Sequence, residues 1–129
     1  MSFAVAIDGP AGAGKSTIAR AAAKELGFIY VDTGALYRSI GLNALRNDIN
    51  IADSYAVEAS LENLKVELAF DDKGAQIVLL NGEDVSSLIR TPEVSMAASK
   101  VSAIPAVRAF LLDLQRNMAK TQSVIMDGR

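Results

Sequence analysis

The chain has 129 residues, of which 50% are hydrophobic, and a formal net charge of −2. This length fits one modest domain with a core of its own, and the slight acidity argues against a general nucleic-acid-binding surface. The absence of cysteine and histidine excludes disulfides, thiolate catalysis and imidazole-based acid–base or metal chemistry. No apolar run approaches the ~20 residues of a membrane span, and the N-terminal segment lacks the pattern of a signal peptide. We therefore expect a cytoplasmic enzyme that binds neither membrane nor nucleic acid.

The first predicted elements are a strand and a glycine-rich loop. Residues 3–7 form a short apolar run that is typical of a buried parallel strand. Residues 9–16 read GPAGAGKS, which matches the phosphate-binding pattern G-x-x-x-x-G-K-S. Its glycines let backbone N–H groups approach an anion, Lys15 supplies charge for the β- and γ-phosphates, and the Ser16 hydroxyl is placed to ligate Mg²⁺. The alternative is a chance glycine turn with a surface lysine.

An alanine-rich helix is predicted to follow the loop, over residues 16–26, and Gly27 suits its C-terminal end. One face of this helix carries Ile18, Ala22 and Leu26. The helix N-terminus would direct its partial positive charge at the phosphates. Residues 28–32 predict a second strand. Strand, helix and strand within ~30 residues indicate a βαβ unit with a parallel sheet and a right-handed crossover.

Two more helices are predicted next along the chain. The first spans residues 35–46, and the side chains expected to face inward are Leu36, Ile40 and Leu45. Asp53 is placed to cap a short second helix. The apolar face of that helix carries Val57, Leu61 and Leu64.

The hydrophobic pattern then alternates with a period of two, which indicates strands. Residues 64–70 and 75–82 predict an antiparallel pair joined by the turn DDKG, and Asn81-Gly82 is a hairpin signal. Residues 83–89 are interpreted as a third, short strand. The prediction is a small antiparallel sheet inserted into an α/β pattern.

The helical period returns at residue 91, with Thr91 as the N-cap and Pro92 at the first helical position. Pro105 opens a further helix. Its inward side is predicted to hold Val107, Phe110 or Leu111, Leu114 and Met118. Residues 123–127 predict a third core strand.

A polar segment, residues 32–38 with the sequence DTGALYR, follows the second predicted strand. In open α/β sheets ligands bind at the carboxyl ends of the strands. Arg38 lies one helical turn further on, where it could hold a second phosphate bidentately. Alone, Arg38 would be interpreted as a surface arginine, but a neighbouring phosphate loop favours the binding role.

These segments together resemble the bacterial cytidylate kinase family, and the resemblance covers the whole chain. The matching motifs, in the family's order, are DGPAGAGKST, DTGALYR, RTPEVSMAASKVSAIPAVR and MDGR. The resemblance implies an α/β fold of the P-loop NTPase class, a three-layer α/β/α parallel sheet whose C-terminal part is missing. Its core would comprise residues 1–63 and 91–129. The antiparallel insert, about 64–90, resembles the family's monophosphate-binding domain.

The function implied by the resemblance is transfer of the γ-phosphoryl group of ATP to CMP or dCMP, with Mg²⁺. These would be small-molecule substrates of an enzyme that is a monomer when complete. Phosphoryl transfer mainly needs positioning and charge neutralisation, so it does not require histidine or cysteine. The alternatives are a non-catalytic nucleotide-binding P-loop fragment and a P-loop kinase for another small acceptor.

The resemblance also implies roles for individual residues. The ATP phosphates would be wrapped by Gly9, Pro10, Ala11, Gly12, Ala13, Gly14, Lys15, Ser16 and Thr17. Arg38 and Arg129 would hold the acceptor phosphate, as catalytic residues beside Lys15, and Thr33 would lie nearby. Ser99 and Arg108 would read cytosine, whose ring edge offers one amino donor and two acceptors.

Several of these assignments leave an alternative open. Ser99 and Arg108 lie on two predicted helices and converge only if the connection between them turns back; alone, Ser99 suits a solvated helix position. Asp127 ends an apolar strand and could hold Mg²⁺ through water, orient Arg129, or only cap a turn. Asp8 is a weaker candidate that fixes the start of the loop.

The sequence departs from the family pattern in length. The family's chain continues with an aspartate that helps read cytosine, an arginine-rich lid and further core strands. We interpret the sequence as an N-terminal fragment, with a naturally short protein as the alternative. We expect the fragment to bind nucleotide weakly without turnover. We also expect it to self-associate through the strand at residues 3–7 or to be only marginally stable, unless a partner segment covers that edge.

Overall fold

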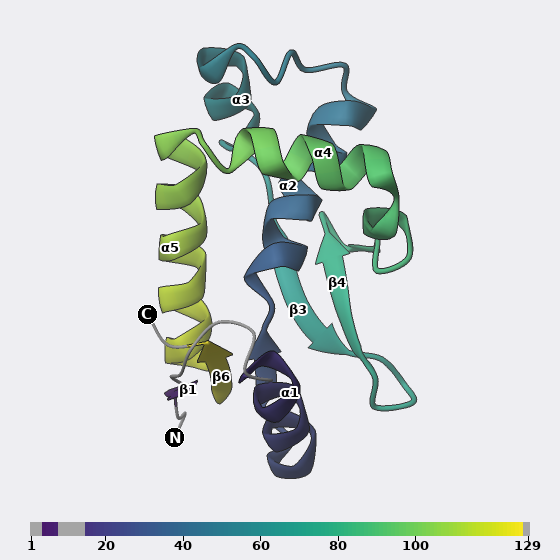
Figure 1. Ribbon diagram of the computed structural model, residues 1–129, viewed down its shortest axis with the longest axis vertical. Helices are drawn as coiled ribbons and strands as arrows, with labels where there is room; N and C mark the ends of the chain where they lie inside the picture. Colours follow the sequence, from purple (N-terminus) through teal and green to yellow (C-terminus); the bar gives the residue numbers. More distant parts are fainter. Residues whose placement is uncertain (1–3, 8–14, 128–129) are drawn as a thin grey trace. The chain divides into compact units, whose positions relative to one another are not determined.

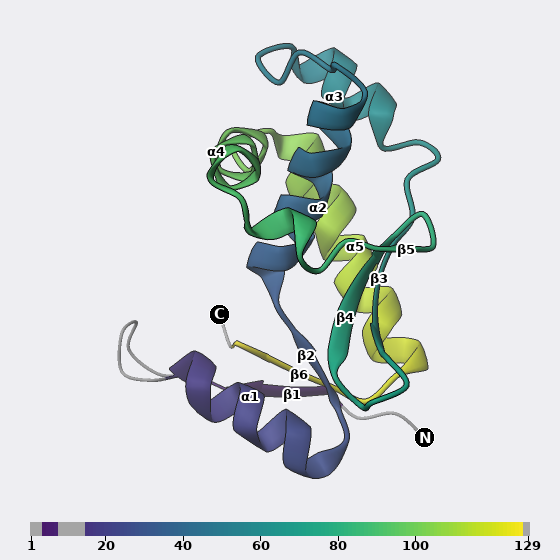
Figure 2. The ribbon, with the colours of Figure 1, turned by 90° about the vertical axis from the view of Figure 1, so that its right-hand side faces the viewer.

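The computed structural model describes residues 4–7 and 15–127, with backbone only for 5–7, 15–17 and 126–127. The chain divides into two compact units, Met1–Asp32 with Leu114–Arg129, and Thr33–Asp113. Figures 1 and 2 together label the helices and strands of both units.

The first unit contains a three-stranded parallel sheet with the strand order β1-β6-β2. Its strands are β1 (Ala4–Ile7), β2 (Ile29–Val31) and β6 (Val124–Asp127). Ile7 pairs with Asp127 and Val31 with Met126, so the carboxyl ends of all three strands meet at one edge. The predicted strands and their parallel direction are confirmed, and Phe3, at the start of the first predicted strand, lies outside the described residues.

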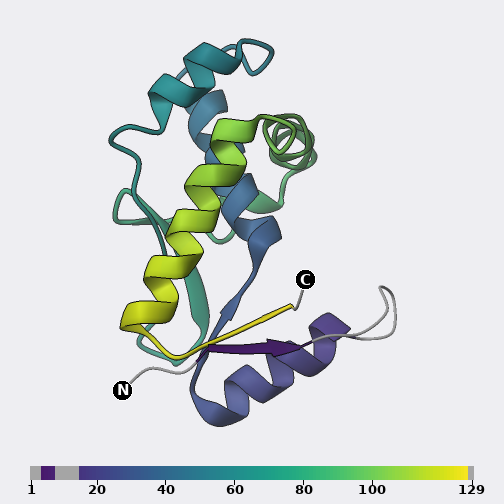
Figure 3. The ribbon, with the colours of Figure 1, turned by 90° about the vertical axis from the view of Figure 1, so that its left-hand side faces the viewer.

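Helix α1 (Lys15–Leu26) covers one side of this sheet (Figures 2 and 3). Ala19 and Ala23 are buried against Tyr30 and Ile125. Their small side chains let the helix approach the strands closely. Gly27, at φ +72°, ends the helix as predicted.

The predicted apolar face of α1 is wrong at both of its ends. Ile18 and Leu26 are each 58% exposed, and Ala22 is half-buried. The contact with the sheet is made one residue further along the helix, by Ala19 and Ala23, which are four residues apart and therefore share a face. Alanine gives only a weak hydrophobic signal in a sequence, so the prediction was based on the larger apolar side chains instead.

The second unit is built around α2 (Thr33–Arg46), which packs along α4 (Pro92–Val101) (Figure 1). The two helices approach most closely at Gly41. A Cβ atom at this position would lie 2.9 Å from the backbone nitrogen of Ala98 and 3.1 Å from the Cβ of Ala97. The helix pair therefore depends on a residue without a side chain at this point.

The inward face of α2 was predicted correctly except at its C-terminal end. Leu36 and Ile40 are fully buried, but Leu45 is 43% exposed. Leu45 lies nine residues after Leu36, which rotates it by about 180° to the opposite side of the helix. Ala44 is buried in its place.

Two helix caps predicted from the sequence are confirmed. The Asp53 side chain accepts hydrogen bonds from the backbone nitrogens of Tyr55 and Ala56 at the start of α3 (Ser54–Ser60), at 3.1 and 3.2 Å. The Thr91 hydroxyl accepts from the backbone nitrogen of Val94 at 3.3 Å, with proline in the first turn of α4. Each cap satisfies backbone donors that the helix itself cannot pair.

The antiparallel sheet of the second unit has the strand order β3-β4-β5. Its strands are β3 (Val66–Phe70), β4 (Gln76–Leu80) and β5 (Glu83–Asp84). Asn81 and Gly82 both have positive φ, 51° and 86°, as the predicted hairpin turn requires.

The third strand is much shorter than predicted. Asp84 accepts hydrogen bonds from both the backbone nitrogen and the hydroxyl of Ser86, at 3.0 and 2.6 Å. The Ser86 hydroxyl oxygen in turn accepts from the backbone nitrogen of Val78 at 2.9 Å. The Ser86 side chain thus takes the place of a backbone acceptor in the hydrogen-bonding ladder between β4 and the segment after β5. A short 3₁₀ helix, η1 (Leu88–Arg90), follows.

Helix α5 (Pro105–Thr121) follows α4 after a turn of 99°. The predicted inward positions Val107, Leu111 and Met118 are buried, whereas Phe110 and Leu114 are half-buried. In the described residues, no single helix is long and apolar enough to cross a membrane; α4 and α5 meet that criterion only as a bent pair, by length and composition.

Candidate nucleotide-binding site

The carboxyl edge of the parallel sheet is the candidate phosphate site. Strand β1 ends at Ile7, and the chain enters α1 at Lys15. Asp127 pairs with Ile7 in the register of the sheet, so it lies beside the point where the loop begins. The strand before the loop and the helix after it are therefore both confirmed. A glycine-rich phosphate-binding motif requires these two flanking elements.

The structure describes the predicted phosphate-site residues only in part. Outside the described residues lie Asp8, Gly9, Pro10, Ala11, Gly12, Ala13, Gly14 and Arg129. Lys15, Ser16 and Thr17 form the first turn of α1, where the N-terminal backbone N–H groups and the helix dipole favour an anion. Asp127 is the last residue of β6. Their roles toward a nucleotide stay predictions.

This edge of the sheet also holds a contact that sequence reasoning missed. The Arg20 guanidinium lies 3.4 Å from a carboxylate oxygen of Asp32 and 5.2 Å from the centre of the Tyr30 ring. The ion pair is exposed and so adds little stability. It links α1 to the end of β2, where the segment DTGALYR begins. Nothing in the sequence distinguishes Arg20 from other helix-surface arginines.

The predicted acceptor residues Thr33 and Arg38 lie on α2 in the second unit. Thr33 is its exposed first residue, and Arg38 is half-buried. Within the described part of the chain, the Arg38 guanidinium has no ion pair and no side-chain hydrogen bond. An arginine that has no partner among the described residues is well suited to an anionic ligand.

The two residues predicted to read the base lie on neighbouring helices. Ser99 is exposed on α4, and Arg108 is exposed on α5. The helices turn by 99° at their connection, as convergence of the two side chains requires. The Ser99 backbone carbonyl accepts a hydrogen bond from the Ser102 hydroxyl at 2.7 Å, and the Ser99 hydroxyl itself has no hydrogen bond among the described residues. Their convergence on one ligand stays a prediction.

Binding of a phosphate ligand with a loosely held divalent cation stays a prediction for this edge of the sheet. Among the described residues, no three acidic side chains gather as a metal site. Mg²⁺ in nucleotide sites is bound mainly by phosphate oxygens, water and one or two protein oxygens, so it needs no such cluster. Ser16, on the first turn of α1, is the residue that would contribute a hydroxyl.

Comparison with known proteins places the chain in a family. The family model described as Cytidylate kinase matches residues 5–129. The chain belongs to the cytidylate kinase family. This membership implies the α/β fold of P-loop NTPases, in agreement with the parallel sheet and the separate antiparallel sheet of the structure.

Similar proteins named cytidylate kinase occur in several bacteria. The one from Pelotomaculum thermopropionicum is 50% identical over 125 residues, which cover 97% of this chain and 55% of the relative. The one from Caldicellulosiruptor bescii has the same identity and coverage. The one from Exiguobacterium sp. is 47% identical over 128 residues, 99% of this chain and 57% of the relative. The chain therefore spans little more than half the length of these relatives.

Proposed function

We propose that the complete protein transfers the γ-phosphoryl group of ATP to CMP or dCMP, which gives ADP and CDP or dCDP. The observation that carries this proposal is the family match over residues 5–129. The strand–loop–helix context around GPAGAGKS and the identity to proteins named cytidylate kinase support it. We further propose a monomeric cytoplasmic enzyme whose parallel sheet is covered by helices on both faces when the protein is complete.

The donor side of the reaction would depend on the first turn of α1 and the loop before it. Backbone N–H groups of residues 9–17 would bind the ATP phosphates, and Lys15 would balance the charge that builds on the β- and γ-phosphates. When bound, Mg²⁺ would neutralise the same oxygens. Ser16 would offer its hydroxyl to that ion, and Asp127 would hold it through water or orient Arg129.

The acceptor side would depend on two arginines and on the residues assigned to the cytosine ring. Arg38 would bind the phosphate of CMP, since the residue is half-buried and its guanidinium has no partner in the described residues. Arg129 would share this role, with Thr33 nearby. Ser99 and Arg108 would pair with the edge of the cytosine ring.

The test is a coupled assay of ADP formation by the complete protein with ATP, Mg²⁺ and one acceptor at a time. We expect turnover with CMP and dCMP and far less with AMP. The variant Lys15→Ala controls for contaminating kinases. Equal turnover with AMP would assign the protein to another acceptor, and ADP formation without any acceptor would show an ATPase instead.

A further inference from the structure

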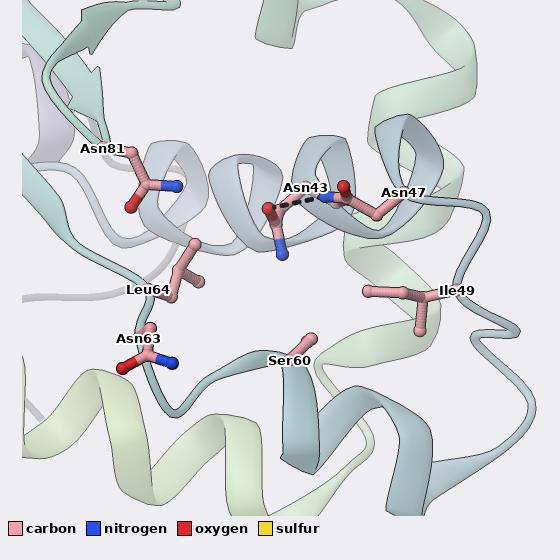
Figure 4. Close-up of a pocket in the computed structure, with 7 residues that line it drawn as sticks. All are labelled: Asn43, Asn47, Ile49, Ser60, Asn63, Leu64 and Asn81. Carbon is pink, nitrogen blue, oxygen red and sulfur yellow. Dashed lines mark hydrogen bonds between the residues drawn. The ribbon is translucent and has the colours of Figure 1, made fainter.

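A cavity that involves none of the residues assigned above lies within the unit of residues 33–113. It has a volume of about 270 Å³ and is framed by the end of α2, the connection after it, the end of α3 and the turn after β4. The residues that line it are Asn43, Asn47, Ile49, Ser60, Asn63, Leu64 and Asn81 (Figure 4). We call it the asparagine pocket.

The orientation of the Asn43 amide follows from its neighbour. The Asn47 side-chain nitrogen donates to the backbone oxygen of Asn43 at 2.8 Å and to its side-chain oxygen at 3.0 Å. A backbone carbonyl can only accept, so the group that Asn47 presents must be its nitrogen. The atom of Asn43 that faces Asn47 must then be the oxygen, and the Asn43 nitrogen, Nδ2, points the other way.

Nδ2 of Asn43 is a buried donor without a partner in the described residues. The residue is only 8% exposed, and Figure 4 shows its nitrogen directed away from Asn47, toward the space that Leu64 and Ser60 border. Buried polar groups are nearly always hydrogen-bonded, so this donor is met in the pocket by an acceptor, which is either water or a bound molecule.

The rest of the lining describes the kind of molecule that would fit. Asn81 uses its side-chain oxygen to accept from the backbone nitrogen of Lys65 at 2.9 Å, which leaves its nitrogen as a second donor. The Ser60 hydroxyl donates to the backbone oxygen of Val57, so its oxygen remains an acceptor. Ile49 and Leu64 add apolar surface.

No residue that lines the pocket carries a charge. A phosphate or carboxylate would therefore lose its hydration there without a counter-charge. We propose that the asparagine pocket binds a neutral, carbonyl-bearing small molecule, of the size of a nucleobase or nucleoside, with Asn43 Nδ2 donating to the carbonyl oxygen. Its apolar ring face would lie against Ile49 and Leu64.

This site is separate from the proposed acceptor site on the same helix. Asn43 follows Arg38 by five residues, a rotation of about 140° around α2. The two side chains therefore leave the helix in different directions. The proposal does not depend on which nucleotide the protein phosphorylates.

The test uses uridine as the neutral probe, added to the complete ¹⁵N-labelled protein and followed by NMR. We expect the side-chain amide signals of Asn43 and Asn81 to shift in a saturable manner. Inorganic phosphate at the same concentration should leave them in place. Absence of a saturable shift with uridine would overturn the proposal, because the pocket would then hold water alone, and an equal response to phosphate would overturn the neutral-ligand assignment.

Variants separate this pocket from other sites. Asn43→Asp replaces the inward donor by an acceptor and should weaken uridine binding about tenfold or more, the value of one lost hydrogen bond. Asn50→Asp makes the same charge change at an exposed residue whose side-chain oxygen accepts from Ala52, a bond that aspartate retains, and should have no effect.

If Asn43→Asp does not fold, Ile49→Phe provides a second route, because a larger side chain in this half-buried connection fills the pocket. It should abolish the uridine-induced shift of the Asn43 amide. Undiminished binding in the folded variants would overturn the proposal.

Discussion

Lys15 occupies the first position of α1, directly after the loop. We predict that Lys15→Ala in the complete protein lowers the rate of phosphoryl transfer by on the order of 10²-fold or more, because one preorganised charge is lost where negative charge develops. Steady-state kinetics and circular dichroism together test this. The matched control is Lys24→Ala, in the last turn of the same helix, which should keep full activity. A Lys15→Ala enzyme with near-normal turnover would remove Lys15 from the proposed mechanism.

Arg38 is the half-buried cation on the first half of α2. We predict that Arg38→Ala raises the KM for CMP far more than the KM for ATP, because the residue is assigned to the acceptor phosphate. Arg46→Ala, at the far end of the same helix, serves as the control and should change neither KM. Equal increases in both KM values for Arg38→Ala would instead indicate that Arg38 has a structural role.

At the scale of elements, the α2–α4 contact depends on Gly41. We predict that Gly41→Ala destabilises the protein by up to about 2 kcal/mol, since the new methyl would meet the backbone of α4. The overpacking cost of about 1–3 kcal/mol is offset in part by a gain of about 1 kcal/mol in helix propensity. Chemical denaturation gives the free energy of unfolding. Ser95→Ala, at an exposed position of α4, should change it by less than about 0.5 kcal/mol. A Gly41→Ala variant as stable as the parent would show that the helices can separate slightly without cost.

The end of α2 is tied to β5 by a bidentate ion pair. The Arg46 guanidinium donates to both carboxylate oxygens of Glu83, at 2.7 and 3.0 Å. These hydrogen bonds lower the pKa of Glu83 below its ordinary value of 4.5 and raise the pKa of Arg46. A carboxyl group whose pKa is lower in the folded state adds stability above its unfolded pKa, and this stability is lost as the pH falls through the folded pKa.

We therefore predict that Glu83→Gln reduces the loss of stability that the protein shows below pH 4.5. The measurement is the free energy of unfolding as a function of pH, for the parent and the variant. Glu62→Gln, the same charge change at an exposed residue, should leave the acid limb of the curve as it is. Superimposable curves for the parent and Glu83→Gln would mean that the ion pair is formed equally in the unfolded chain or is too solvated to matter.

Local chemistry made most of the elements predictable from the sequence. The caps Asp53 and Thr91 and the turn Asn81-Gly82 each act within a few residues, so the sequence alone identifies them. The extent of β5 was not predictable, because Ser86 ends it through a hydrogen bond to Val78, a residue eight positions earlier. The prediction of the buried face of α1 was wrong for a similar reason, because that face is decided by close packing against a sheet that lies elsewhere in the sequence, and such packing favours small residues.

The candidate sites also differ in whether they depend on neighbouring residues or on residues far apart in the sequence. The phosphate loop was predictable because its motif and its flanking elements are contiguous in the sequence. The Arg20–Asp32 pair and the asparagine pocket were not, because they form only when separate elements meet. The positions of Asn43, Asn47, Asn63 and Asn81 show no pattern in the sequence, yet the fold brings these four residues together around one cavity.

At the scale of the whole molecule, the parallel sheet has open edges. In the described strands, β1 and β2 each pair with β6 alone, so the far side of β1 presents unpaired backbone groups. The sequence of β1, AVAI, is entirely apolar. Unpaired apolar edge strands are templates for pairing with another chain, and the exposed Ile18 and Leu26 of α1 add apolar surface to the same unit.

We predict that a polypeptide of residues 1–129 self-associates and does not form ADP from ATP and CMP. The complete protein should remain a monomer and should form ADP from the same substrates. The association follows from the open edge of β1. The inactivity follows because residues 1–129 do not include the arginine-rich lid that the family resemblance implies, and an arginine in that role is worth ~10³–10⁵ in rate. Light scattering over a range of concentrations and the coupled assay measure the two effects on both proteins. A stable monomer of residues 1–129 would show that the β1 edge does not pair, and turnover equal to that of the complete protein would show that residues 1–129 contain the whole catalytic site.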